Sequence, residues 1–425
     1  MNLRQKISKK NSNVGIIGLG YVGLELAINI SDSGYKVFGF DKNIKKITTL
    51  KKKISPISTI INKRIKSLNT KWIFSMKNIS MINSCDIIII CVPTPLKNNN
   101  VPDMKHVTDS FNSIYKFLRP EQLIILESTV YPGATEDIFL KKINKNKKLN
   151  VGKNFYLGFS PERVSPGKDY DIPYRNITKV VSGHSQNCLE LVKLFYKKIF
   201  KKIYPTSSIK VAEFTKLYEN SYRSVNIGLV NQMKMIADGI DLDIHDVIDA
   251  AKTKPFGFKP FIPGPGVGGH CIPVDPFFIS WISDKKKINS DFIKISHKVN
   301  VEVTDWTIDK IKKNISIADK KILIIGVSYK KDIDDSRESP VLEIFKNFNK
   351  KFKVDYYDTY IKKIKIDKNI HFSIKSLERI HLYDVVIIGT DHSNIDYNLI
   401  VYNSKKIFDT RGVLRKYKSD NIIPC

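Results

Sequence analysis

Short apolar runs alternate with longer amphipathic stretches in the first half of the chain. Val14–Gly18, Lys36–Phe40 and Asp86–Val92 have the length of buried strands, and Leu24–Asp32 has helical periodicity. Two further runs of strand length follow, Leu123–Glu127 and Tyr156–Phe159. Strands that alternate with helices are typical of a parallel sheet covered on both faces. The pattern therefore predicts a doubly wound α/β domain.

The pattern changes after Tyr204 and Pro205. One long helix is expected over Ile209–Gly239, with further helices over Ile244–Ala251 and Ser290–Lys313. Strand-length runs then return, around a helix at Val341–Phe348: Lys321–Val327, Val354–Tyr357, Val385–Gly389 and Ile407–Phe408. We expect two Rossmann-like doubly wound parallel-sheet domains joined by a long central helix in an all-helical middle domain. The expected boundaries are 1–11 for a basic leader, 12–205 and 317–425 for the α/β domains, and 206–316 for the helical domain.

The first strand ends in a glycine-rich turn with the spacing GxGxxG. Gly18 permits a tight turn, Gly20 lets a pyrophosphate approach the backbone, and Gly23 allows close packing of helix on strand. The helix N-terminus faces the pyrophosphate. Asp41, at the end of the second strand, would accept hydrogen bonds from the adenosine ribose and favours NAD over NADP. The alternative is a glycine-rich turn without a ligand.

Polar residues follow three other predicted strands. Thr94 and Thr129 each come just after a strand, with a proline close behind. Ligands of open parallel sheets bind outside the carboxyl ends of the strands, so both hydroxyls are expected to meet cofactor or substrate. Helix caps or turn hydroxyls are the alternative. Glu162 and Arg163 follow the next strand, either as an acid for chemistry beside a cation for a substrate anion, or as a surface ion pair.

The segment Pro263–Pro276, PGPGVGGHCIPVDP, is too rich in glycine and proline for a helix or strand and is expected to be a shaped loop. Two glycines directly precede His270 and Cys271, and Asp275 follows. A cysteine is often only a small buried hydrophobe. Here the glycines, the carboxylate and the dinucleotide turn favour Cys271 as a nucleophile.

The long predicted helix carries a polar stripe. Lys216, Asn220 and Arg223 are four and three residues apart, so they share one face with Glu213. Such stripes are usually solvated surface. The apolar residues elsewhere on the helix indicate instead a central helix whose polar stripe lines a cleft. The opposite face is apolar enough to pack and carries Val211, Phe214, Leu217, Tyr218, Ser221 and Val225.

Composition limits the other classes of protein. The formal net charge of +29 raises the possibility of a nucleic-acid binder, but lysine is abundant throughout the chain, which does not indicate a dedicated phosphate-binding patch. A positive field would attract an anionic substrate. No run of about 18 apolar residues or signal-peptide core occurs, so we expect a cytoplasmic protein without membrane association. The five cysteines form no CxxC pair, and no metal site is expected.

Several motifs together resemble the UDP-glucose/GDP-mannose dehydrogenase family over nearly the whole chain. They are GLGYVG, VPTP, ESTVYPGATE, SPERVSPG, AEFTKLYENSYRSVN, GPGVGGHCIPVDP and YKKDIDDSRESP, in family order. SPERVSPG and the cysteine loop resemble most the branch that acts on UDP-N-acetylhexosamines, especially UDP-N-acetylglucosamine 6-dehydrogenases. The glucose branch usually has a second glutamate where Pro166 stands here.

The resemblance implies NAD-dependent, four-electron oxidation of C6 of a nucleotide sugar, best matched by UDP-GlcNAc, in the assembly of a surface polysaccharide such as O-antigen or capsule. Cys271 would form a thiohemiacetal and then a thioester. A homodimer or higher homo-oligomer through the central helices is also implied. The first α/β domain would bind NAD, the helical domain would carry the cysteine loop, and the second α/β domain would bind the UDP-sugar.

The resemblance also implies roles for single residues. Catalysis is assigned to Cys271, Lys216, Asp275, Asn220, Glu162 and Thr129. NAD binding is assigned to Gly18, Gly20, Tyr21, Val22, Gly23, Asp41, Lys46, Thr94, Thr129 and Arg337. Substrate binding is assigned to Arg163, Val164, Lys216, Asn220, Arg223, Gly268, Tyr329, Lys330 and Arg411. The role of His270 stays open.

Other interpretations remain. UDP-ManNAc, UDP-GalNAc or UDP-glucose could be the substrate. A two-electron β-hydroxyacid dehydrogenase also joins a Rossmann domain to a helical domain, but it lacks the cysteine and a third domain. A non-catalytic sugar-nucleotide sensor would be expected to lose Cys271, Lys216 or Asp275.

Overall fold

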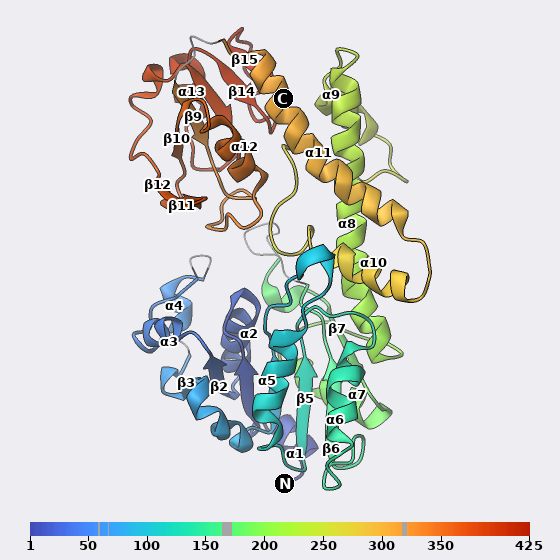
Figure 1. The fold of residues 1–425 in the computed structure, drawn as a ribbon. Coiled ribbons are helices and arrows are strands. Elements are labelled where there is room, and N and C mark those ends of the chain that lie inside the picture. The colour runs from blue at the N-terminus through green and yellow to red at the C-terminus, as the bar shows by residue number, and fades with distance from the viewer. Residues whose placement is uncertain (58–59, 67, 164–171, 317–320) are drawn as a thin grey trace. The chain divides into compact units, whose positions relative to one another are not determined.

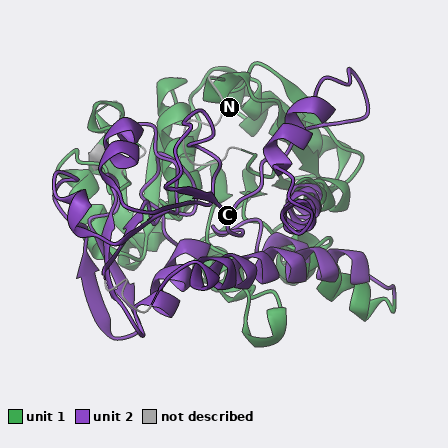
Figure 2. Cartoon of the chain, turned by 90° about the horizontal axis from the view of Figure 1, so that it is seen from above, with its two compact units in different colours: residues 1–219, 277–287 green, residues 220–276, 288–425 purple. Residues whose placement is uncertain are grey.

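The computed structural model describes residues 1–57, 60–66, 68–163, 172–316 and 321–425. The chain divides into two compact units, which are coloured separately in Figure 2 and described separately here. Unit 1 comprises residues 1–219 and 277–287, and unit 2 comprises residues 220–276 and 288–425.

Unit 1 is built on an eight-stranded sheet with the order β3-β2-β1-β4-β5-β6-β7-β8. Strands β1 to β6 are parallel, and β7 runs antiparallel to β6. The strand order reverses between β1 and β4: β1 to β3 follow one another toward one edge of the sheet, and β4 to β6 toward the other. Rossmann folds bind their ligands at such a reversal of strand order. The strands are β1 (Asn13–Ile17), β2 (Lys36–Asp41), β3 (Ile73–Ser75), β4 (Ile87–Ile90), β5 (Gln122–Leu126), β6 (Phe155–Phe159), β7 (Lys179–Gly183) and β8 (Ile203–Pro205).

Both faces of this sheet are buried because helices cover each of them (Figure 1). Successive residues of β4 belong to opposite cores: Ile87 and Ile89 to one, Ile88 and Ile90 to the other. Each fully buried isoleucine contributes about 2–3 kcal/mol. The helices are α1 (Leu3–Ser8), α2 (Tyr21–Asp32), α3 (Ile44–Lys51), α4 (Asn62–Ile65), α5 (Lys105–Tyr115), α6 (Lys141–Ile143) and α7 (Gln186–Tyr196).

Residues 1–11, expected as a leader outside the first domain, fold onto it. Asn2 caps α1 in a capping box with Gln5. Leu3 and Ile7 are buried in the same core as α2 and α7. Their helical spacing of four was the signal that the basic composition obscured.

The long predicted helix is α8 (Ile209–Asp238), and α9 (Ile244–Ala251) follows it. Sequence reasoning missed α10 (Asp275–Lys285), which begins at Asp275 inside the segment expected to be loop. Helix α11 (Asp291–Lys313) completes the middle of the chain. The expected packed face of α8 is packed only in part: Leu217 and Ser221 are buried and Val225 is half-buried, whereas Val211, Phe214 and Tyr218 are exposed.

Unit 2 contains a five-stranded parallel sheet with the order β10-β9-β13-β14-β15 and a separate hairpin of β11 and β12. Ile322 and Ile324 point into one core and Leu323 and Ile325 into the other. The two Rossmann-like domains predicted from the sequence are thereby confirmed. The elements are β9 (Lys321–Ile325), α12 (Pro340–Phe348), β10 (Lys353–Tyr357), β11 (Lys363–Ile366), β12 (Asn369–Phe372), β13 (Val385–Ile388), α13 (Tyr397–Asn403), β14 (Ile407–Asp409) and β15 (Ile422–Pro424).

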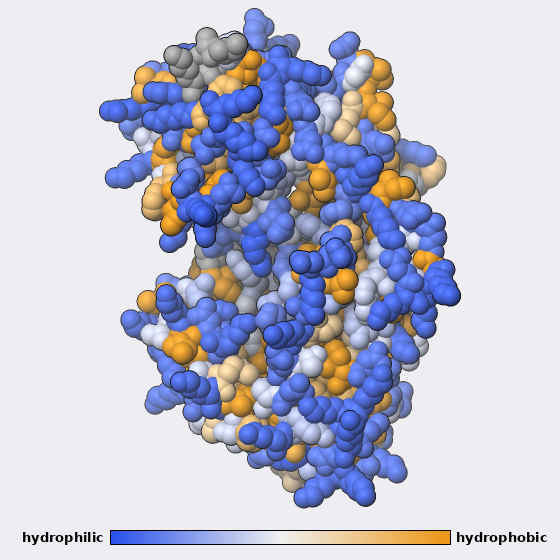
Figure 3. All heavy atoms as spheres, viewed as in Figure 1, coloured by the Kyte–Doolittle hydropathy of each residue, from blue (hydrophilic) through white to orange (hydrophobic). Residues whose placement is uncertain are grey.

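No helix in the described ranges is long and apolar enough to cross a membrane. The face drawn in Figure 3 is mostly hydrophilic, with apolar side chains in smaller patches between the polar ones.

Candidate functional site

The turn after β1 is shaped by its glycines. Gly18 has φ +94°, which disfavours any other residue, and a Cβ on Gly23 would lie 1.9 Å from the carbonyl oxygen of Gly18. A Cβ on Gly20 would meet nothing within 4 Å. Gly20 also caps α2 without a side-chain hydrogen bond. The backbone is therefore tightly packed on one side and open at the start of α2, where Tyr21 and Val22 lie, and this fits a pyrophosphate.

Asp41 ends β2 beside this turn. Its carboxylate accepts hydrogen bonds from the Leu19 amide at 2.9 Å, the Asn43 amide at 2.8 Å and Lys46 Nζ at 2.9 Å. A carboxylate offers about four acceptor positions, so one is left among the described contacts. Asp41 thus fits a ribose hydroxyl. Lys46, expected to contact the cofactor, is paired with Asp41.

The two predicted threonines lie at strand ends as expected. Thr94 is buried and Thr129 half-buried. The ends of β4 and β5 are joined because Ser128 Oγ accepts a hydrogen bond from the Val92 amide at 2.9 Å. Thr94 and Thr129 follow Val92 and Ser128 closely in the chain and therefore lie near the carboxyl edge of the sheet, where ligands of such folds bind.

Glu213, the first member of the polar stripe on α8, is fully buried rather than solvated. It accepts hydrogen bonds from the amides of Gly133 and Thr135 at 2.5 and 2.9 Å, and from Thr135 Oγ1 at 2.7 Å. Burial raises its pKa to about 7. Glu213 therefore anchors the turn that follows Thr129.

Glu162 is buried and belongs to a polar cluster that sequence reasoning missed. Tyr174 donates a hydrogen bond to Glu162 Oε2 at 3.1 Å, and Lys179 Nζ lies 3.6 Å from the same oxygen. Lys179 also bonds Glu127, at 2.9 Å. Glu127 in ESTV and Lys179 at the start of a strand were each visible as charges in apolar surroundings.

Arg163 pairs with Glu219 at 2.7 Å and donates to the Thr178 carbonyl at 3.0 Å. Its guanidinium is thus held against Glu219 of α8, within unit 1. Val164, predicted to contact substrate, lies outside the described residues.

In unit 2, the cysteine loop is held from two helices. The Gly264 amide donates to Asn231 of α8 at 3.1 Å, and Lys234 Nζ donates to the Gly264 carbonyl at 3.3 Å. Thr304 of α11 donates to the Pro265 carbonyl at 2.8 Å. Of the five cysteines, Cys271 is exposed, whereas the other four are buried.

Asp275 connects Cys271 to α8. The Asp275 amide donates to the Cys271 carbonyl at 2.8 Å, and Asn220 donates from its side-chain amide to Asp275 Oδ2 at 2.5 Å. Asp275 is only 2% exposed. Lys216 is half-buried and precedes Asn220 by about one turn of α8, while Arg223 is exposed. The predicted catalytic residues Asn220 and Asp275 are therefore in direct contact.

The loop after β9 lies against the cysteine loop. A Cβ on Gly268 would be 2.5 Å from Tyr329 Cβ and 2.6 Å from the Glu338 carbonyl oxygen. The Gly269 amide donates to the Arg337 carbonyl at 2.9 Å. The close approach expected at Gly268 is thus an approach to Tyr329 within the protein. The Arg337 guanidinium, expected to reach the cofactor, pairs with Asp335 at 2.6 Å.

Basic side chains lie beside these loops. Burial lowers the pKa of Lys330 to about 8. Arg411 Nε donates to the Gly389 carbonyl at 2.8 Å, while its Nη2 is buried and makes no hydrogen bond among the described residues. An enclosed guanidinium nitrogen of this kind suits an anionic or carbonyl ligand.

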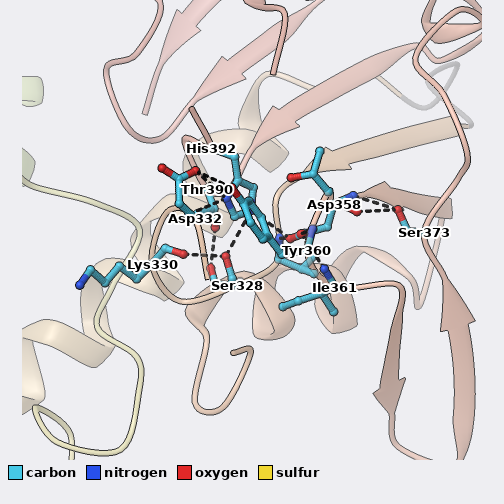
Figure 4. Close-up of polar contacts among 12 residues, drawn as sticks. Ser328, Lys330, Asp332, Asp358, Tyr360, Ile361, Ser373, Thr390 and His392 are labelled. Carbon is cyan, nitrogen blue, oxygen red and sulfur yellow. Dashed lines mark hydrogen bonds and ion pairs between the residues drawn. The ribbon is translucent and has the colours of Figure 1, made fainter. Parts of the chain in front are cut away.

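His392 holds the loop that carries Tyr329 and Lys330 (Figure 4). Its Nδ1 accepts the Asp332 amide at 2.9 Å, so Nε2 carries the proton and faces Asp358 Oδ2 at 3.2 Å. His392 and Asp358 are fully buried. The Lys330 side chain extends away from this cluster in Figure 4, while its carbonyl accepts a hydrogen bond from Ser328 at 2.7 Å.

Asp358 repeats the geometry of Asp41. It follows β10 as Asp41 ends β2, and it accepts the Val327 amide at 2.8 Å, as Asp41 accepts Leu19. Asp358 also accepts the Tyr360 and Ile361 amides. Burial opposes its ionisation, but the hydrogen bonds from His392 and the backbone outweigh burial and lower its pKa.

Sequence comparisons match three consecutive segments of the chain. Family models match residues 12–200 (UDP-glucose/GDP-mannose dehydrogenase family, NAD binding domain), 210–302 (central domain) and 323–416 (UDP binding domain). The chain is thus an NAD-binding oxidoreductase. It belongs to the UDP-glucose/GDP-mannose dehydrogenase family.

Known relatives cover nearly the whole chain. The UDP-N-acetyl-D-glucosamine 6-dehydrogenase of Salmonella typhi is 31% identical over 96% of this chain and 97% of its own length. The UDP-N-acetyl-D-mannosamine dehydrogenase of Methanocaldococcus jannaschii is 33% identical over 94% and 92%. The solved UDP-D-ManNAc dehydrogenase of Pyrococcus horikoshii superposes with a TM-score of 0.84 at 28% identity, covering 97% and 98%.

Proposed function

We propose that this protein oxidises C6 of a UDP-N-acetylhexosamine, with UDP-GlcNAc as the preferred sugar, to the uronic acid through a thioester on Cys271. The observation that carries the proposal is the exposed Cys271 on a loop fixed through Asp275 to Asn220 and packed at Gly268 against Tyr329. Relatives named for GlcNAc and for ManNAc make UDP-ManNAc the main alternative, ahead of UDP-GalNAc and UDP-glucose.

NAD, when bound to the turn at Gly18, Gly20 and Gly23 with Asp41, supplies the hydride acceptor for both oxidations. The thiolate of Cys271 adds to the aldehyde carbon and keeps the half-oxidised sugar bound. Lys216 and Asn220 stabilise the negative oxygen that results. Asp275 orients Asn220. Glu162 accepts a proton from the water that cleaves the thioester, with Thr129 holding that water.

In this scheme Tyr329, Lys330 and Arg411 bind the nucleotide, while Arg163, Val164, Arg223 and Gly268 bind the sugar. Arg337 contributes to the cofactor pocket. We further propose a homodimer through the central helices. The apolar side chains that α8 exposes support this assignment, among them Tyr218 at 63% exposure. The product would enter a surface polysaccharide, and the enzyme would work in the cytoplasm.

One assay tests the proposal. The purified protein is given NAD and, in turn, UDP-GlcNAc, UDP-ManNAc, UDP-GalNAc and UDP-glucose, and NADH is counted per sugar consumed. We expect two NADH per sugar and the highest kcat/KM with UDP-GlcNAc. A ratio of one would assign the two-electron class, no turnover with any sugar would indicate a binding protein, and preference for another sugar would correct the substrate.

Nucleotide binding should depend on the charge of Lys330. Its pKa of about 8 means that the ammonium is present at pH 7 and lost by pH 9. We expect the affinity for UDP to fall about tenfold over this interval, the equivalent of a charged hydrogen bond of about 1.5 kcal/mol. Calorimetric titration measures the affinity. Lys330→Met should bind weakly at both pH values, whereas Lys331→Met, at an exposed neighbour, should keep the pH dependence; a flat wild-type profile contradicts the assignment.

A further inference from the structure

A buried lysine lies between two buried carboxylates at the carboxyl edge of the unit 1 sheet. Lys179 Nζ is 2.9 Å from Glu127 Oε2 and 3.6 Å from Glu162 Oε2. The three residues are 3%, 3% and 8% exposed, in the order Lys179, Glu127 and Glu162. Glu162 is therefore the member nearest to solvent, and the other two stand behind it.

The direction of β7 produces this arrangement. Because β7 is antiparallel, its first residue reaches the edge where the parallel strands end. Gly158 pairs with Gly183 and Phe159 with Ser182, and continuing this register sets Glu162 opposite Lys179. The Pro161 carbonyl accepts a hydrogen bond from Lys179 Nζ at 3.3 Å. The register of β6 and β7 therefore places Lys179 beside Glu162, on its more buried side.

When ionised, the three charged groups supply one positive and two negative charges. Other titratable groups that face it in the described part of the chain include Tyr196, which donates to Glu127, Tyr174, which donates to Glu162, and the Cys91 thiol. Burial raises the pKa of all three well above ordinary values, so they stay neutral. Burial disfavours charge, so the ionised state of each carboxylate depends on the lysine beside it and is opposed by the other carboxylate.

The pKa values of Glu127 and Lys179 also reflect the opposition between burial and neighbouring charges. Burial raises the pKa of Glu127 despite the nearby Lys179 ammonium. Burial alone would lower the pKa of Lys179, but Glu127 and Glu162 outweigh it and raise that pKa. Lys179 therefore stays charged and attracts both carboxylates.

We propose that Lys179 and Glu127 are positioning residues for Glu162: the lysine holds the carboxylate in place, and the second carboxylate makes the cluster a proton acceptor. The inference rests on the proposed function, in which Glu162 is the base that releases the product. Water forms a C–O bond to the thioester carbon, and one water proton passes to Glu162. The C–S bond breaks, its electron pair leaves with the Cys271 sulfur as a thiolate, and no oxidant is consumed.

Two variants change the charge of the cluster in opposite directions. Lys179→Met leaves two buried carboxylates without a cation, so Glu162 should hold its proton to higher pH. Glu127→Gln leaves one ion pair, so Glu162 should stay ionised to lower pH. We expect the rising limb of the pH profile of steady-state turnover to move up by about one unit in Lys179→Met and down by about one unit in Glu127→Gln. The double variant removes one charge of each sign, and its limb should return toward that of the wild type.

The affected step can be isolated. Lys179→Met should release a rapid burst of two NADH per active site, followed by turnover about 100-fold slower at pH 7. Mass spectrometry should find the acyl group on the Cys271 peptide. Lys179→Arg should restore much of the rate, and Lys198→Met, the same replacement at an exposed site of unit 1, should behave as wild type.

The outcomes are separable. The role of Lys179 and Glu127 is overturned if the rising limb of the pH profile stays in place in both single variants, or if it moves in the same direction in both. Either result leaves the thioester chemistry intact. A wild-type ratio of one NADH per sugar without an acyl-enzyme overturns the proposed function and this inference together. Because Glu127→Gln is isosteric, its pH profile decides the question even where thermal melting shows Lys179→Met to be unfolded.

Discussion

Replacement of Cys271 by serine is expected to abolish formation of the uronic acid while leaving nucleotide binding unchanged. A serine hydroxyl is far less acidic than a thiol, so it adds poorly to the aldehyde and gives no thioester. Steady-state production of two NADH per sugar should fall by more than about 10³-fold, as is typical when an enzyme loses its nucleophile. The loop itself should keep its shape, because its anchors at Gly264, Pro265 and Asp275 do not involve the sulfur.

Cys271→Ser can be checked by counting NADH and by calorimetric titration with UDP. The matched control is Cys188→Ser, a buried cysteine of unit 1 whose sulfur accepts the Leu157 amide at 3.4 Å, as a serine hydroxyl can. A further check uses the native protein. Because Cys271 is the exposed one of the five thiols, iodoacetamide should label one site and inactivate the enzyme in parallel. Full four-electron turnover by Cys271→Ser would refute the thioester scheme.

The second large effect is expected at the glycine-rich turn. Gly23→Ala would place a Cβ 1.9 Å from the Gly18 carbonyl oxygen, a backbone atom that cannot rotate away. Helix α2 must then move off β1, at a cost of about 1–3 kcal/mol or more in the free energy of unfolding. Thermal unfolding should report the loss, and NAD binding should disappear with the turn.

Gly20→Ala separates binding from folding. Its Cβ meets nothing within 4 Å, and its φ of −82° suits alanine, so the melting temperature should match the wild type. The methyl group would nevertheless stand in the pyrophosphate position. We expect NAD affinity to fall roughly 10- to 100-fold, the equivalent of an overpacking cost of about 1–3 kcal/mol. If Gly20→Ala bound NAD as tightly as the wild type, the cofactor would lie elsewhere.

Much of the architecture could be predicted because it depends on patterns of neighbouring residues in the sequence. Strands such as Ile87–Ile90 are continuous apolar runs, and α9 was predicted with the bounds that the structure shows. Helix α10 was missed because the glycine and proline content of the preceding loop hid its start at Asp275. The helix at the start of the chain was missed because its two apolar residues, Leu3 and Ile7, stand among basic neighbours.

The candidate site was predictable only in part. The identity of Cys271 and Asp275 followed from the loop, but the contact of Asp275 with Asn220 joins residues far apart in sequence. The pairing of Lys179 with Glu127 and Glu162 depends on β7 running antiparallel, a property of strand order that no local pattern contains. The same applies to His392, which follows β13 and bonds Asp358 after β10, although β9 lies between these two strands in the sheet.

Asp358 and Asp41 differ in how many acceptor positions of the carboxylate the protein itself already occupies. Amides of Val327, Tyr360 and Ile361 and the His392 ring fill all four acceptor positions of Asp358. A ribose finds no free acceptor position at that carboxylate, so of these two corresponding aspartates only Asp41 can bind a dinucleotide in this way. Under the proposed chemistry, the first reduced nicotinamide must depart and a fresh molecule must arrive midway through each catalytic cycle. A covalent tether to sulfur keeps the reactive aldehyde from diffusing away during that exchange.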